Sequence, residues 1–274
     1  CRACHGPGRN QGHGGARLGL FSKPRVDHVI IPEPLNKDRI CLGHRGVWWA
    51  EIETKGRIAH GSMPFLGDSA IRHMGAVLEA FEHELYPALD RKQTMMPVVP
   101  EGARRSTLNL NSLHGGQTED FFPGLPSPTV ADSCRLVIDR RFLLEESVDE
   151  VKSEVTAILD RLKRERPRFD YALRDLMEVL PTMTERNTPV VSAVAAGIRR
   201  VIGREPDYVI SPGTYDQKHI ARIGHLHETI AYGPGILDLA HQPDEYVGIE
   251  DMVESAKVMA LATHALLTAA SEKA

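Results

Sequence analysis

Residues Lys55–Ile71 read Lys-Gly-Arg-Ile-Ala-His-Gly-Ser-Met-Pro-Phe-Leu-Gly-Asp-Ser-Ala-Ile, and this stretch decides how the chain around it folds. An apolar run, Gly46–Glu53, precedes it, and an amphipathic helical pattern follows it. Because Gly and Pro interrupt regular structure, the pattern predicts a strand, then a tight turn that presents His60, then a helix. Most histidines in such turns are merely solvated, so the surrounding motif has to decide whether His60 has a function.

The segment from 46 to 179 predicts alternating strands and helices. Asp68 is expected to cap a helix whose apolar stripe is Ile71, Met74, Leu78, Phe81 and Leu85. A capping box, Ser147–Glu150, opens a second helix with Val151, Val155, Ile158 and Leu162 facing inward. Strands are expected at Val47–Glu53, Met95–Val99, Ser106–Leu113, Cys134–Phe142 and Arg168–Val179. The resulting order predicts a ferredoxin-like α+β domain, one antiparallel sheet with two helices on one face.

The flanking segments have a different pattern. Val26–Ile31 is β-branched and reads as a buried strand, and Pro32-Glu33-Pro34 places Glu33 at its carboxyl end, where open α/β sheets form their sites. From Asn187 onward helices and strands alternate, which is typical of α/β architecture. The predicted elements are Pro189–Val201, Asp207–Ser211, a helix ending near Ile223, Glu228–Ala231, and Ile249–Ala270 with an apolar face of Val253, Ala256, Met259, Ala260 and Leu267.

We therefore expect two domains. Residues 1–45 and 183–274 would form an α/β domain, a mostly parallel sheet with helices on both faces. Residues 46–182 would form the inserted α+β domain.

The composition of the 274 residues is that of a soluble globular protein, with 42% hydrophobic and 26% charged residues. A net charge of −4 and the lack of long basic runs argue against a nucleic-acid partner, and no apolar run is long enough to span a membrane. Residues 1–20 lack the apolar core of a signal peptide, and four cysteines do not make a disulfide framework, so a cytoplasmic location is expected.

The first residues are anomalous. Cys1-Arg2-Ala3-Cys4-His5 matches the haem-attachment signature C-x-x-C-H and could also be half of a zinc site. Haem attachment would need export, and zinc binding would need a second Cys/His pair, so we expect neither. A disordered, truncated or mis-framed start is the preferred interpretation.

The pattern Gly-x-x-Ala-His-Gly-Ser-x-Pro-x-x-Gly-x-Ser-Ala-Ile at 56–71 resembles the dimerisation-domain motif of a zinc amidohydrolase family. That family contains acetylornithine deacetylase, succinyl-diaminopimelate desuccinylase, aminoacylase and the carboxypeptidase G type enzymes. The resemblance implies a homodimer formed through 46–182. It also implies that His60 reaches the partner subunit's site and donates a hydrogen bond to the oxyanion.

Two further segments carry the resemblance and imply metal ligands. Ile30–Leu35 resembles the family's Glu-Pro segment, which implies that Glu33 binds one zinc ion. Gly233–Val247 resembles the signature Gly-Pro-Gly…Ala-His-x-x-(Asp/Asn)-Glu, which implies that His241 binds a second. The alternative for His241 is a loop histidine bonded to Glu245. The implied cofactor is two zinc ions per subunit, with cobalt or manganese as substitutes.

The resemblance also implies substrate contacts. Arg45 would bind the substrate carboxylate, with a salt bridge at the domain hinge as the alternative, and Ile138–Arg141 resembles the family's Asp-x-Arg. By position its arginine is Arg141, although Arg140 is adjacent. Gly213, Thr214 and Asp216 match a Gly-Thr-x-Asp segment that lines the family's pocket, whereas Thr214 could instead cap a helix. The family's Asn before a Val/Ile-Pro pair has no counterpart in Phe121–Val130.

The family's first metal ligands and its general base all precede the Glu-Pro segment, and this sequence has no acidic residue before Asp27. The resemblance covers residues 24–267 and corresponds to the later two-thirds of a family member. We expect an N-terminally truncated member of a family that hydrolyses the amide bond of an N-acylated amino acid or small peptide, with little or no activity in these residues alone. The alternative is a non-catalytic dimeric homologue that binds acidic metabolites.

Overall fold

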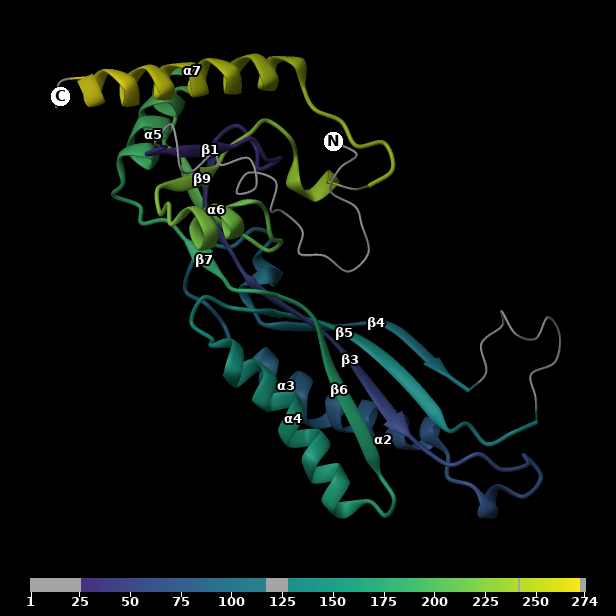
Figure 1. Cartoon of the computed structure of the whole chain (residues 1–274). Helices are drawn as coiled ribbons and strands as arrows, with labels where there is room; N and C mark the ends of the chain where they lie inside the picture. The colour runs from purple at the N-terminus through teal and green to yellow at the C-terminus, as the bar shows by residue number, and fades with distance from the viewer. Residues whose placement is uncertain (1–25, 117–127, 241, 272–274) are drawn as a thin grey trace. The chain divides into compact units, whose positions relative to one another are not determined.

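A computed structural model describes residues 26–116, 128–240 and 242–271 of the chain (Figure 1). The described residues form two compact units. Unit 1 comprises 26–45, 95–104 and 181–271, and unit 2 comprises 46–94 and 105–180 with the gap at 117–127.

Unit 2 contains one antiparallel four-stranded sheet in the order β4-β5-β3-β6. Its elements are β3 (Gly46–Lys55), η1 (Pro64–Leu66), α2 (Ala70–Ala80), η2 (Phe81–Leu85), α3 (Tyr86–Asp90), β4 (Thr107–Gly115), β5 (Ser133–Phe142), α4 (Val148–Glu165) and β6 (Asp170–Val179). The predicted ferredoxin-like arrangement is confirmed, since strand, helix, strand, strand, helix and strand follow one another and the two long helices cover one face (Figure 1).

The core of unit 2 is formed by every second residue of its strands and by one face of each helix. In β3, Trp48, Ala50 and Ile52 are fully buried, while the intervening residues on the other face stay partly exposed. The capping box at Ser147 and Glu150 is confirmed, because each side chain bonds the other residue's backbone N–H. The predicted inward face of α4 is confirmed as well: Val151, Val155, Ile158 and Leu162 are buried, together with Leu159.

The predicted start and stripe of α2 were partly wrong. Ser69, not Asp68, is the N-cap, and its hydroxyl accepts from the Arg72 N–H at 3.4 Å. Asp68 instead accepts a hydrogen bond from the His73 ring at 3.0 Å. The buried face consists of Ala70, His73, Met74, Val77 and Ala80, whereas Ile71 is 48% exposed. Of the predicted stripe, Met74, Phe81 and Leu85 are buried as expected, and Ile71 is the member that the structure exposes.

The strand expected at Met95–Val99 is absent, and the segment belongs to unit 1 rather than to the inserted domain. Pro97 and Pro100 have no N–H to donate, so a regular ladder cannot form there. Val98 makes a single parallel bridge to Ile210, and the Pro97 carbonyl accepts from the Ile210 N–H at 2.8 Å. The short helix η3 (Glu101–Arg104) then leads back to unit 2.

Unit 1 is built on a mixed sheet. Its strands are β1 (Val29–Ile31), β2 (Arg39–His44), β7 (Thr182–Met183), β8 (Asp207–Ser211) and β9 (Thr229–Ala231). β1 pairs with β9 and β2 with β8 in parallel, whereas β7 runs antiparallel to β2 and a single antiparallel pair, Cys41 with Ala231, links β2 to β9. The α/β layout is confirmed, although β2 and β7 were not anticipated from the sequence. The helices are α5 (Pro189–Ile202), α6 (Gln217–Gly224), η5 (Leu237–Leu239) and α7 (Ile249–Ser271).

The apolar face predicted for α7 was wrong. Ser255, Val258 and Ala262 are fully buried, whereas Val253 is 48% and Leu267 68% exposed. Gly197 of α5 explains the register, because a Cβ there would lie 3.0 Å from the Val258 carbonyl oxygen. The two helices therefore cross so closely that a side chain at position 197 would press against Val258. No helix in the described ranges is long and apolar enough to cross a bilayer.

A buried polar network joins the strands of unit 1. The Tyr215 hydroxyl lies 2.5 Å from the Gln217 Oε1 and 3.6 Å from the Cys41 Sγ. The Gln217 amide donates to the Leu42 carbonyl at 3.1 Å and to the Thr229 carbonyl at 2.8 Å. Burial raises the pKa of the Cys41 thiol to about 11, and burial also raises the pKa of Tyr215 well above its ordinary value.

We expect the free energy of unfolding to fall as the pH rises from about 9 to about 11. The unfolded thiol ionises near its ordinary value of 9.0 while the folded thiol keeps its proton to about 11, so the unfolded state releases protons first. A shift of this size corresponds to about 2–3 kcal/mol for Cys41. Urea denaturation followed by circular dichroism at each pH measures it. Cys41→Ala should flatten the profile, and an identical profile in that variant would contradict the assignment.

Candidate active site

A cavity of about 430 Å³ lies in unit 1 where β1, β8 and β9 end. Residues after all three strands line it: Glu33, Pro34 and Leu35 after β1, Ser211 to Tyr215 at the end of β8, and Leu237, Asp238, Ala240 and Gln242 after β9. Pro100, from the segment 95–104, completes the described lining. Because β1 and β9 are parallel, their carboxyl ends meet at one edge, which is where α/β sheets form their sites.

Glu33 is half-buried in the cavity wall. The backbone of Glu33 lies directly against Gly233, since a Cβ at position 233 would be only 2.4 Å from the Glu33 carbonyl oxygen. The glycine therefore allows the segments after β1 and β9 to touch. Burial lowers the pKa of Lys218, and the carboxylates of Asp216 and Glu33 oppose that shift, so Glu33 contributes negative charge to this edge of the sheet.

The metal ligand inferred at His241 lies outside the described residues. Its two neighbours, Ala240 and Gln242, both line the cavity that contains Glu33. The chain therefore passes the cavity on either side of position 241.

The described residues do not by themselves fit a zinc centre. Zinc sites use three or four protein ligands, and no group of three His, Cys, Asp or Glu side chains in the described ranges could hold a metal ion. Glu33 and Asp238 are the carboxylates in the cavity lining, and they are too few. A complete centre needs ligands beyond the described residues.

The Gly-Thr-x-Asp segment is only partly in the cavity. Gly213 and Thr214 line it, and the Gly213 N–H donates to the Ser211 hydroxyl at 3.2 Å. Asp216 is exposed, does not line this cavity and occupies the N-cap position of α6 without a side-chain capping bond. The alternative that Thr214 caps the helix is therefore not what the structure shows.

Arg45 is buried, with 6% of its surface exposed. Its Nε donates to the Pro212 carbonyl and its Nη1 to the Ala103 carbonyl, both at 3.2 Å. The guanidinium thus ties the loop after β8 to η3 within unit 1. These contacts give Arg45 a structural role and leave its proposed contact with a substrate carboxylate as an expectation.

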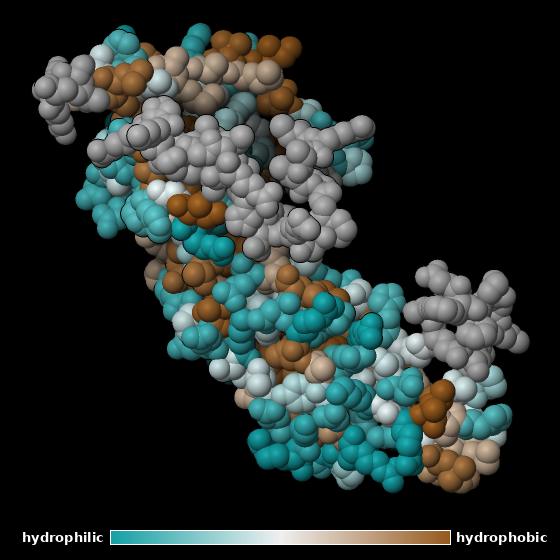
Figure 2. Space-filling view, in the orientation of Figure 1, coloured by the Kyte–Doolittle hydropathy of each residue, from teal (hydrophilic) through white to brown (hydrophobic). Residues whose placement is uncertain are grey.

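His60 is exposed in the loop between β3 and α2 of unit 2. The backbone around it is fixed: His60 bridges Thr129, the Gly61 N–H donates to the Pro128 carbonyl at 2.6 Å, and the Met63 N–H donates back to the His60 carbonyl at 2.8 Å. Large apolar side chains gather on the same loop, where Figure 2 shows a hydrophobic patch at the end of unit 2. The exposed residues are Ile58 (56%), Met63 (41%), Phe65 (76%) and Leu66 (54%).

Arg140 and Arg141 have different environments on β5. Arg141 is partly exposed and makes two hydrogen bonds to Asp139, Nε to Oδ1 at 2.6 Å and Nη2 to Oδ2 at 2.9 Å. Arg140 is fully buried on the helix-covered face and donates to Glu146 at 2.8 Å and Glu154 at 3.2 Å. Of the two arginines, Arg141 is the one that an external carboxylate can reach.

Among the residues of the cavity lining that sequence reasoning did not assign to a site are Tyr215, Asp238 and Pro100. Tyr215 lies within the Gly-Thr-x-Asp segment and Asp238 within the segment 233–247. Their places inside these two motifs were the signal from which they could have been found. Pro100 had no such signal, because it reaches the cavity only through the return of 95–104 to unit 1.

Comparison with known proteins assigns the inserted unit. Residues 42–167 match the model of the M20 peptidase dimerisation domain. This segment is therefore similar to M20 dimerisation domains. The dimerisation domain includes β3 to α4, and with them the His60 loop and Arg141.

Relatives extend the similarity beyond the dimerisation domain. The chain is 28% identical over 240 residues to acetylornithine deacetylase of Myxococcus xanthus, which covers 87% of this chain and 57% of the relative. It is 26% identical over 250 residues to succinyl-diaminopimelate desuccinylase of Azoarcus sp., covering 89% and 59%. The similarity to these two enzymes thus extends along most of the chain, which spans less than three-fifths of their length.

Solved structures share the fold. Human carnosine dipeptidase 1 superposes with a TM-score of 0.66 at 19% identity, covering 90% of this chain and 61% of that one. The M20 metallo-carboxypeptidase Sso-CP2 of Sulfolobus solfataricus gives 0.64 at 18% identity, covering 88% and 64%. At these identities the similarity concerns the fold alone.

Proposed function

We propose that the complete protein is a metal-dependent hydrolase that cleaves the amide bond of an N-acylated amino acid or small peptide. The observation that carries this is the cavity of unit 1, in which Glu33 and both neighbours of His241 line one space at the carboxyl edge of the sheet. The relatedness to M20 deacylases supports it.

Glu33 and His241 are the proposed metal ligands of this chain. Zinc is the proposed metal, with cobalt or manganese as alternatives, and a bound divalent ion polarises a substrate carbonyl and lowers the pKa of a coordinated water. The further ligands and the general base are proposed to lie in a part of the complete protein that precedes Asp27. For this reason the 274 residues alone are proposed to have little or no activity.

The proposed roles of the remaining residues concern binding and charge. His60 donates a hydrogen bond to the oxyanion of the partner subunit's site. Arg141 and Arg45 bind a substrate carboxylate, and Gly213, Thr214 and Asp216 contact the substrate. The Arg141 guanidinium already bonds Asp139, so a substrate carboxylate would have to displace Asp139 or bind the same guanidinium beside it.

The proposed homodimer has physical support in β4. This nine-residue strand lies at the edge of its sheet, and no other described strand pairs with its outer side. Long open edges are normally covered, because their free N–H and C=O groups bind other chains. A second copy pairing along β4 would cover both edges at once.

Native mass spectrometry of the protein isolated from its source tests the proposal in one measurement. We expect a dimer whose subunit exceeds the mass of the 274 residues and carries two metal ions. The metal content per subunit should fall in Glu33→Gln, because this variant lacks one ligand. The same preparation should hydrolyse N-acylated amino acids. A metal-free dimer of these residues alone, without hydrolysis, would instead support the non-catalytic homologue that binds acidic metabolites.

A further inference from the structure

In the part of the chain that the structure describes, Ser62 is the residue that holds the His60 ring. The Nδ1 atom of His60 lies 2.7 Å from the Ser62 hydroxyl oxygen and 3.2 Å from the Ser62 backbone nitrogen. Ser62 itself is fixed by the turn that the hydrogen bond from Met63 to His60 closes at 2.8 Å. Both contacts therefore reach the same ring nitrogen from a rigid stretch of four residues.

These contacts determine where the proton of the neutral ring lies. A backbone N–H can only donate, so Nδ1 must present its lone pair to Ser62. In a neutral imidazole one nitrogen donates and the other accepts, so the proton is on Nε2. The Ser62 hydroxyl, which can rotate its hydrogen toward Nδ1, reinforces the same tautomer.

We propose that Ser62 is a positioning residue that fixes the Nε2–H tautomer of His60 and points this N–H away from its own loop. The exposed ring then offers a donor to an acceptor outside the loop. The assignment of the tautomer stands on the geometry of this loop. Its catalytic meaning rests on the proposed function, in which His60 must donate to an oxyanion and would fail in the other tautomer.

His73 provides an internal reference for the test. Arg166 donates from Nε to the His73 Nδ1 at 3.1 Å, and the His73 Nε2 lies 3.0 Å from Asp68 Oδ2. Because a guanidinium N–H can only donate, His73 has the same tautomer, held without any contribution from Ser62. Its ring is buried, so its signals also report whether unit 2 remains folded.

The experiment is long-range ¹H–¹⁵N correlation NMR of the ¹⁵N-histidine-labelled chain at a pH where its histidines are neutral, with the His60 signals assigned from their loss in His60→Gln. We expect an unprotonated Nδ1 and a protonated Nε2 for His60 and for His73. In Ser62→Ala the tautomer ratio of His60 should fall by about 2- to 10-fold, the effect of one hydrogen bond. His73 should be unchanged, and Ser62→Thr, which keeps the hydroxyl, should restore His60.

A protonated Nδ1 in the original chain, or His60 signals that do not move in Ser62→Ala, would overturn the proposal. In the complete protein, Ser62→Ala should lower kcat by the same factor by which it lowers the fraction of His60 in the Nε2–H tautomer, with KM unchanged, and Ser62→Thr should recover it. If that fraction falls measurably in the NMR spectra while kcat does not follow it, the tautomer assignment holds and the donor role of His60 in the proposed function is wrong.

Discussion

Replacing His60 by Ala in the complete protein is expected to lower kcat by about 100- to 1000-fold with little change in KM. Removing one preorganised oxyanion donor has this effect because the hydrogen bond strengthens only as negative charge develops in the transition state. Steady-state kinetics on an N-acylated amino acid measure it. His83→Ala is the matched control, since His83 is an exposed histidine of the same unit in η2, and its kcat should be unchanged. A His60→Ala enzyme with the original kcat would exclude the donor role.

The same variant tests whether His60 acts in the partner's site. His60→Ala and Glu33→Gln subunits should each form nearly inactive homodimers. A mixed dimer would contain one doubly defective site and one intact site, so an equal mixture should regain about a quarter of the original activity after subunit exchange. If the mixture stays as inactive as its components, His60 serves its own subunit's site.

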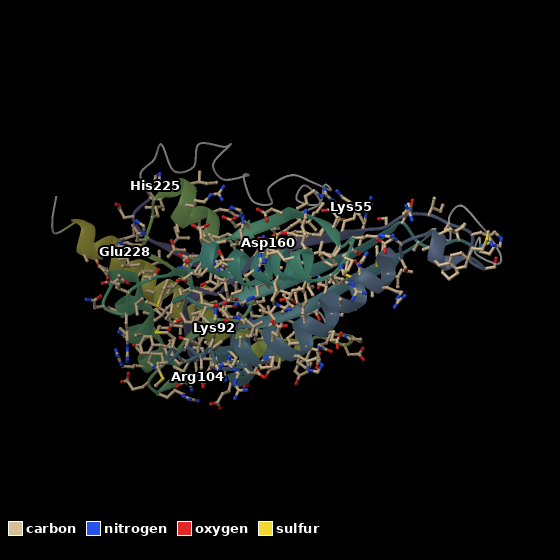
Figure 3. All side chains as sticks on the ribbon, turned by 90° about the horizontal axis from the view of Figure 1, so that it is seen from below. Lys55, Lys92, Arg104, Asp160, His225 and Glu228 are labelled. Carbon is tan, nitrogen blue, oxygen red and sulfur yellow. The ribbon has the colours of Figure 1, made fainter. Side chains whose placement is uncertain are left out.

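Replacing Arg140 by Met is expected to destabilise unit 2 by about 3–5 kcal/mol, because it removes the buried one of the two cations that pair with the Glu146 carboxylate. Glu146 has only 8% of its side chain exposed and accepts from Arg140, from Lys92 and from the Leu143 N–H, each at 2.8 Å, and from the Ser106 hydroxyl. Lys92 (labelled in Figure 3) also bonds Glu154. Arg140 is the only member of this cluster that is fully buried, so water cannot take its place.

Urea unfolding followed by tryptophan fluorescence measures this effect, since both tryptophans of the sequence, Trp48 and Trp49, lie in β3. Arg141→Met is the matched control: its pair with Asp139 is partly exposed, so its loss should cost at most about 1 kcal/mol. Burial alone would raise the pKa of Glu146, but Arg140 and its hydrogen-bond donors outweigh burial and lower it. The cluster therefore raises the free energy of unfolding at pH values above the ordinary pKa of a glutamate, and this contribution is lost as the pH falls below that value. Equal losses in the two variants would contradict the assignment.

The Glu146 cluster also fixes the two ends of unit 2 between which residues 95–104 lie in the sequence. Thr94 and Ser106 flank the segment 95–104, and their hydroxyls bond Glu145 and Glu146 respectively. The Ser106 N–H donates to the Lys92 carbonyl at 3.3 Å, which brings the two ends of the segment together. Residues 95–104 themselves belong to unit 1, where the Ala103 carbonyl accepts from Arg45.

Several features of the fold could be predicted because they depend on neighbours in the sequence. The capping box at Ser147 and Glu150, the inward face of α4 and β8 were found correctly, since a cap needs residues three positions apart and a face needs only its own periodicity. The ferredoxin-like order followed from the sequence of these elements. The motif around His60 identified the dimerisation domain for the same reason, because its turn residues are contiguous.

What the sequence by itself determined about this protein is therefore the ferredoxin-like order of unit 2, the inward face of α4 and the similarity of the His60 segment to M20 dimerisation domains. The tertiary structure alone decided that 95–104 joins unit 1 and that α7 buries Ser255 and Val258 instead of Val253. It also decided that Arg140 pairs with Glu146 in the interior while Arg141 is accessible. Each of these depends on a partner far away in the chain: Ile210 for Val98, Gly197 for Val258, and Glu146 and Glu154 across from β5 for Arg140. Local pattern specifies which residues prefer burial, but close approach and charge pairing are settled only when distant segments compete for the same space.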